Sequence, residues 1–85
     1  MFPKRRIDVT TRDVNGETLI LDRMREEVHQ LNKSASYVWQ RCDGKTSVAE
    51  IAQSMVHEFN VRPEDVERDL AGLIARFSDL KLLES

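Results

Sequence analysis

The chain has few of the residues from which catalytic and metal sites are built. Its 85 residues include one cysteine and two histidines, so no internal disulfide can form and the ligands for an iron–sulfur cluster or a closed zinc site are missing. The three glycines are isolated from one another, which excludes a glycine-rich phosphate loop. Paired carboxylates such as Glu26 and Glu27 are adjacent and would point in different directions along a strand. We therefore expect a protein that is not an enzyme and that has no cofactor and no metal.

Long apolar runs and a large net charge are also missing. No apolar stretch reaches the length of a signal-peptide core, and together with the single cysteine this predicts a cytoplasmic protein that does not enter a membrane. Thirteen basic residues stand against 15 acidic ones, a net charge of −2. Such a balance offers no overall attraction to phosphate backbones, so we expect no nucleic-acid partner.

The composition divides the chain into an arm and a domain. Residues 1–6, MFPKRR, contain a proline and three consecutive basic residues without apolar periodicity, which predicts a flexible, solvated basic arm. No linker or internal repeat interrupts residues 7–85, so they are expected to form a single domain. A chain of this size buries only about 60 to 65 % of its unfolded surface, so we expect binding at the surface rather than in a deep cavity.

Short β-prone runs occupy the first half of the domain. They read IDVTTRDV, ETLILD and EEVHQL, and Asn15-Gly16 between the first two is a strong hairpin signal. The runs predict a three-stranded antiparallel meander. In the third run His29 and Leu31 share one face. The second run does not show which of its faces is buried. Thr18, Ile20 and Asp22 lie on one face and Leu19 and Leu21 on the other, so neither face is clearly apolar or polar.

Three amphipathic helices are predicted after the strands. Asn32 is suited to cap the first helix, which Asp43-Gly44 would end. Ser47 and Glu50 form a capping-box pair for the second helix, and Pro63 fits the first turn of the third. Apolar residues at helical spacing mark the buried faces: Ala35, Val38, Trp39 and Cys42; Val48, Ile51, Ala52, Met55, Val56 and Phe59; Val66, Leu70, Leu73, Ile74, Phe77 and Leu80. The expected fold is α+β, a three-stranded antiparallel sheet followed by three helices.

The first two helices and their short connection resemble a helix-turn-helix, so a DNA-binding transcriptional regulator of winged-helix type is the alternative function. The charges of the second and third predicted helices argue against DNA binding. Residues 48–59 contain no lysine or arginine, and residues 62–80 contain three arginines against five acids, whereas a recognition helix normally brings basic side chains to the DNA.

An open strand edge is the remaining candidate for function. If the strands lie in chain order, the outer edge of the third strand has no partner and can accept an added strand. A guest peptide would then direct alternate side chains into the seam between the third strand and the third helix. In a further alternative, a purely structural subunit, a partner interface would cover the same edge.

Four segments together resemble the PqqD family over roughly residues 12–84: the corner LN-x-SAS-xx-W-xxx-DG, the segment TSVAEIA, the helix DVERDLAGLIARF and the closing LKLL. The family includes the pyrroloquinoline quinone biosynthesis protein D and the precursor-peptide recognition elements of ribosomal peptide maturation. The resemblance implies a winged-helix-like domain that binds the leader of a precursor peptide. It also implies that the domain performs no chemistry and presents the leader to a modifying enzyme, such as a radical S-adenosylmethionine protein.

The resemblance further implies which residues bind the peptide. These are Glu27, Val28, His29, Gln30 and Leu31 on the strand edge, and Asp69, Leu70, Leu73, Arg76 and Phe77 on the facing helix. Structural roles are implied for Leu31, Asn32, Trp39, Asp43 and Gly44. The segment EEVHQ is more polar than the aromatic-rich strand common in relatives, and the pathway, whether quinone cofactor, lasso peptide or another, is left open.

Overall fold

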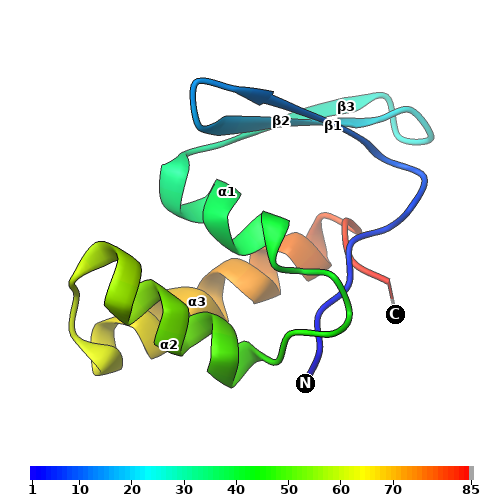
Figure 1. Ribbon diagram of the computed structural model, residues 1–85. Coiled ribbons are helices and arrows are strands. Elements are labelled where there is room, and N and C mark those ends of the chain that lie inside the picture. Colours follow the sequence, from blue (N-terminus) through cyan, green and yellow to red (C-terminus); the bar gives the residue numbers. More distant parts are fainter. Residues whose placement is uncertain (85) are drawn as a thin grey trace.

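A three-stranded sheet lies over three helices in the computed structural model, which describes residues 1–84 (Figure 1). The elements are β1 (Thr10–Val14), β2 (Glu17–Asp22), β3 (Glu27–Leu31), α1 (Lys33–Gln40), α2 (Val48–Phe59) and α3 (Pro63–Asp79). The strands are antiparallel and lie in the order β1-β2-β3. The predicted α+β fold is therefore confirmed. Ser85, the last residue of the expected domain, lies outside the described residues.

Local signals set the ends of most elements. Asn15 and Gly16 both have positive φ, 54° and 82°, as a two-residue type I′ hairpin turn requires. Asn32 caps α1, and Ser47 and Glu50 form the predicted capping box of α2. Two boundaries differ from the prediction: β1 begins at Thr10 rather than near position 7, and α1 ends at Gln40, before Asp43-Gly44.

The core lies between the sheet and the helices. Trp39 of α1 and Phe77 of α3 meet edge to face, with ring centroids 5.4 Å apart, and both are buried. Cys42 is buried beside them, and burial raises the pKa of its thiol to about 11. The thiol therefore stays protonated at neutral pH and packs as a small apolar group.

The inner face of β2 carries Thr18, Ile20 and Asp22, and all three are buried. The buried carboxylate of Asp22 is stabilised by ion pairs with two cations, Arg6 Nη1 at 3.1 Å and Arg25 Nη1 at 3.5 Å. Burial alone would raise the pKa of Asp22, but the Arg25 backbone N–H and the two guanidinium charges outweigh it, and the net shift is downward. Leu19 and Leu21 are left half-buried on the uncovered face of the sheet.

Residues 1–6 do not form the predicted solvated arm. Their backbone bonds to two distant segments: the Arg5 N–H donates to Cys42 O at 2.8 Å, and the Glu84 N–H donates to Lys4 O at 2.8 Å. The Arg5 guanidinium also donates to the carbonyl oxygens of Trp39 and Gln40 at the end of α1, at 2.9 Å each. Figure 1 shows this segment in blue beside the C-terminal tail in red. The composition of residues 1–6 could not predict this pairing, because the segments that they pair with lie far away in the sequence.

Candidate functional site

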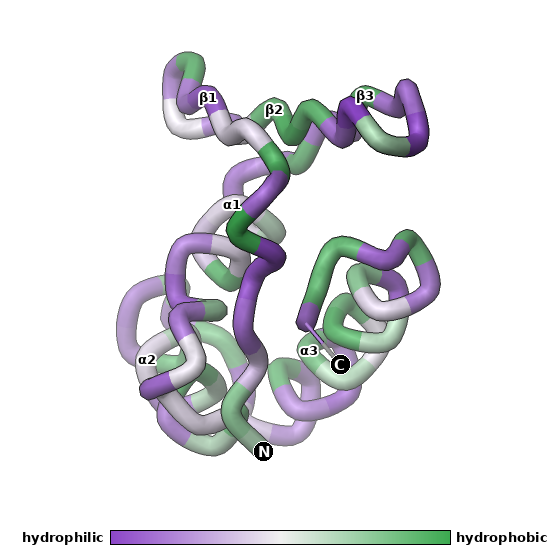
Figure 2. The backbone as a smooth tube through the Cα atoms, turned by 90° about the vertical axis from the view of Figure 1, so that its right-hand side faces the viewer, coloured by the Kyte–Doolittle hydropathy of each residue, from purple (hydrophilic) through white to green (hydrophobic). Residues whose placement is uncertain are grey.

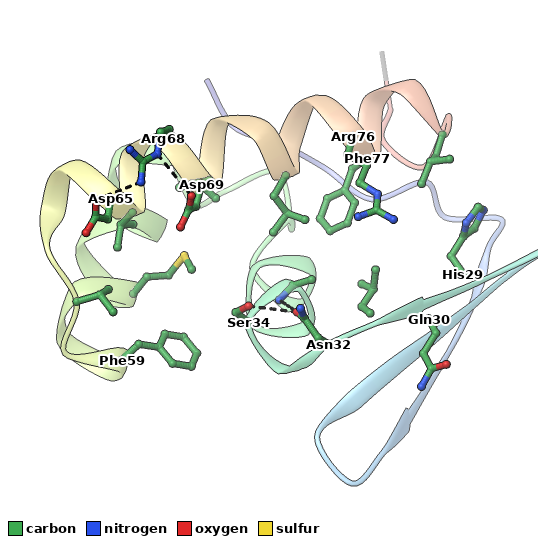
Figure 3. Close-up of a pocket in the computed structure, with 18 of the residues that line it drawn as sticks. His29, Gln30, Asn32, Ser34, Phe59, Asp65, Arg68, Asp69, Arg76 and Phe77 are labelled. Carbon is green, nitrogen blue, oxygen red and sulfur yellow. Dashed lines mark hydrogen bonds and ion pairs between the residues drawn. The ribbon is translucent and has the colours of Figure 1, made fainter.

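A groove of about 990 Å³ opens between β3 and α3 (Figure 3). Figure 2 shows the two elements on the same side of the molecule, with β3 in the sheet above α3. Nine of the ten residues predicted to bind a peptide line the groove: Val28, His29, Gln30, Leu31, Asp69, Leu70, Leu73, Arg76 and Phe77. Glu27 does not line it. The structure thus brings together two sets of residues that are about forty positions apart in the sequence.

The groove has walls that the sequence did not identify. They come from the start of α1, the end of α2 and further positions of α3: Asn32, Ser34, Ala35, Met55, Phe59, Val61, Asp65, Val66, Arg68 and Leu80. Phe59 and Val61 stay 38 % and 42 % exposed. Phe59 is the last residue of the α2 stripe and Val61 follows the end of that helix. These apolar residues beyond the core are the signal that could have identified this wall.

The corner between β3 and α1 is held by side-chain hydrogen bonds. Asn32 Oδ1 accepts from the Ala35 N–H at 2.9 Å and from Ser34 Oγ at 3.1 Å, as the dashed lines in Figure 3 show. Ser36 Oγ accepts from the Thr18 N–H at 2.9 Å and donates to Leu31 O at 3.2 Å. A buried hydroxyl therefore joins the ends of β2 and β3 and ties both strands to α1.

The hydrogen-bond pattern identifies which backbone groups of β3 are free. Val14 and Glu17 close the two-residue hairpin turn, so Glu17 bonds to β1 and the next residue, Thr18, points toward β3. The contact of the Thr18 N–H with Ser36 agrees with this direction. By the same alternation, His29 bonds to its partner Ile20. The N–H and C=O groups of Val28 and Gln30 therefore point away from β2.

That outer edge has no partner among the described residues, since β3 is the last strand of the sheet. Side chains of β3 alternate across it: Val28 and Gln30 are exposed, whereas His29 and Leu31 face the helices. A strand added along this edge would place every second side chain over Leu31, Leu70, Leu73 and Phe77. The arrangement suits recognition of an extended peptide.

Charged groups of the groove are unevenly paired. Arg68 contacts Asp65 at 3.2 Å and Asp69 at 3.8 Å, but no ion pair involves Arg76 among residues 1–84. The His29 Nε2 atom is buried without a hydrogen-bond partner in the described chain. The nearest acidic oxygen, Glu27 Oε1, is 3.7 Å away, beyond hydrogen-bonding distance.

Within residues 1–84 none of the helices combines the length and the apolar character that a membrane crossing needs. Nor do these residues contain three or more His, Cys, Asp or Glu side chains grouped as a metal ion would require.

Comparison with known proteins assigns the chain to a family. The model of the family described as "Coenzyme PQQ synthesis protein D (PqqD)" matches residues 17–83, from β2 to the C-terminal tail, and the chain belongs to this family. It is 40 % identical over 58 residues to the "PqqA binding protein" of Xanthomonas oryzae pv. oryzae strain PXO99A. This match covers 68 % of the chain and 63 % of the relative. The corresponding protein of Xanthomonas campestris pv. campestris strain B100 is 38 % identical over 58 residues.

Two solved structures have the same fold. A lasso peptide synthetase B1 complexed with the leader peptide is 26 % identical, with a TM-score of 0.89 and coverage of 100 % of both chains. TbiB1 in complex with the TbiA(beta) leader peptide also has a TM-score of 0.89, at 23 % identity, and the match covers 96 % of this chain and 95 % of that one.

Proposed function

We propose that this protein is a non-catalytic peptide chaperone, which binds the leader of a ribosomally synthesised precursor peptide as an added strand on β3. The observation that carries the proposal is the free edge at Val28 and Gln30 beside a groove that apolar and charged side chains line together. Main-chain hydrogen bonds to an edge strand bind peptides with little regard to sequence, and the groove supplies the side-chain selection. Three of the ten site residues, Leu31, Leu70 and Phe77, are also core residues, so the base of the groove is part of the core.

The relatives support a leader peptide as the ligand. The Xanthomonas proteins bear the name PqqA binding protein, and both structural neighbours hold a leader peptide. We propose that the bound leader is then presented to a modifying enzyme, with a radical S-adenosylmethionine maturase as the first candidate. DNA binding gains no support, since α2 carries no basic residue other than His57 and Arg68 is already paired with two aspartates.

An NMR titration tests the binding site. A PqqA peptide and the TbiA(beta) leader peptide are added separately to the ¹⁵N-labelled protein. We expect the amide signals of Val28 and Gln30 and those of Leu73 and Phe77 to shift. Amides on the opposite edge of the sheet, in β1, serve as the internal control and should keep their positions. If neither peptide moves the β3 signals, the proposed function is wrong for these leaders.

A second experiment tests presentation to an enzyme. The precursor and its maturase are incubated with and without this protein, and the modified precursor is quantified by mass spectrometry. We expect the yield to rise only when the protein binds the leader. An unchanged yield with a leader that binds would contradict the chaperone role while leaving peptide binding intact.

A further inference from the structure

The two ends of the groove differ in charge. Toward the N-terminal half of α3, Arg68 is shared between Asp65 and Asp69, and one arginine with two aspartates leaves a net charge of −1. Arg76 lies seven positions after Asp69, about 10 Å further along the helix, and it has no ion pair in the described part of the chain. Figure 3 shows its guanidinium directed from α3 into the space between α3 and β3. The groove is therefore acidic at one end and basic at the other.

His29 adds a second, independent feature at the basic end. Its ring projects from β3 toward the C-terminal end of α3 (Figure 3), and its Nε2 atom is buried without a hydrogen-bond partner in the described chain. Buried polar atoms nearly always have a partner in proteins, because an unpaired one costs free energy. A side chain of the ligand that both accepts a hydrogen bond and carries negative charge would satisfy His29 and Arg76 together.

The spacing of an added strand matches these features. Antiparallel pairing is the more stable and more common arrangement, and it places guest side chains over Leu31 and His29 two residues apart, about 7 Å. A third side chain, two residues further toward the N-terminus of the guest, lies beyond Leu31 and about 13 Å from the side chain over His29. That direction leads along α3 from Arg76 toward Asp69 and Asp65.

We propose that the leader recognised here carries a basic, an apolar and an acidic residue at alternate positions, in that order from its N-terminus. The proposal rests on the proposed function and specifies its ligand. The acidic side chain lies between Arg76 and His29, the apolar one packs on Leu31 and Leu73, and the basic one faces Asp69. The Glu27 carboxylate lies outside the groove but 3.7 Å from His29 Nε2, so Glu27 opposes the acidic residue and Arg76 supplies the attraction that outweighs it.

Two synthetic peptides of identical composition test the charge order. Their cores are Lys-Thr-Leu-Thr-Glu and Glu-Thr-Leu-Thr-Lys, with the same threonine and valine flanks, and binding is measured by isothermal titration calorimetry at low salt. We expect the first to bind about three- to tenfold more tightly, the range for partly exposed charge pairs. The Arg76→Glu variant should abolish or invert this preference. Arg62→Glu makes the same charge change at the start of α3, outside the groove, and should preserve it.

Several results would overturn the proposed charge order. Equal affinity for the two peptides, preference for the second, or binding by neither overturns the charge order. Loss of the preference in Arg62→Glu as well would show an effect of net charge alone, and would overturn it too. None of these outcomes touches the proposed function, which depends on the shifts of Val28 and Gln30 with the leader peptides.

Discussion

Proline substitutions on β3 test the edge at single-residue resolution. In Val28→Pro and Gln30→Pro, each proline removes one N–H that points away from β2. The lost hydrogen bond to a bound strand corresponds to about 0.5 to 1.5 kcal/mol, or a two- to twelvefold increase in Kd. Stability should change by less than about 1 kcal/mol, because these N–H groups bond only to water in the free protein and proline is tolerated on edge strands.

His29→Pro is the matched control, because it lies between the two positions on the same strand. Its N–H bonds to Ile20 of β2, and proline there leaves a buried ladder carbonyl unpaired at a cost of about 1 to 3 kcal/mol. We therefore expect His29→Pro to lower the midpoint of thermal unfolding, while the other two variants keep it near the wild-type value.

Two assays separate binding from folding. Fluorescence anisotropy of a labelled leader peptide that binds the wild type gives the Kd, and circular dichroism on heating gives the unfolding midpoint. If Val28→Pro and Gln30→Pro bind the leader as the wild type does, strand addition on β3 is refuted. If those two variants unfold and His29→Pro is stable, the assignment of inward and outward amides is reversed.

Three further predictions concern the scaffold. Ser36→Ala should lower the unfolding midpoint by about 5 to 20 °C, because it leaves two buried backbone groups without their partner; Ser34→Ala, at an exposed site, is the control and should have little effect. The lowered pKa of Asp22 stabilises the fold fully above its unfolded pKa of about 3.9 and less as the pH falls through the folded value. Thermal midpoints between pH 6 and 2 should therefore fall more steeply in the wild type than in Asp22→Asn, and parallel curves would contradict this. Cys42, with a pKa of about 11, should react with a thiol reagent at pH 7 about a hundredfold more slowly in the folded than in the unfolded protein, and equal rates would show that the thiol is accessible.

The elements of the fold follow from local chemistry that the sequence displays. Asn15-Gly16 specifies a turn because both residues tolerate positive φ, and Asn32 and Ser47 begin helices because their side chains satisfy free N–H groups. The stripe that includes Trp39 predicts the buried face of α1. Nine of the ten residues that the family resemblance implied for the peptide site line one groove, since their elements and faces were already correct.

Tertiary structure alone decided how those elements meet. Asp22 faces inward because Arg6 and Arg25 pair with its carboxylate, and Ser36 satisfies the backbone N–H of the buried Thr18. No local sequence pattern indicates these partners, because they lie on other segments. The pairing of residues 1–6 with the α1–α2 connection and the C-terminal tail depends on contacts between the two ends of the chain. The groove is also decided by tertiary packing, because its remaining walls come from α1 and α2. Periodicity reports which face of an element is apolar, whereas only packing determines which other element that face meets.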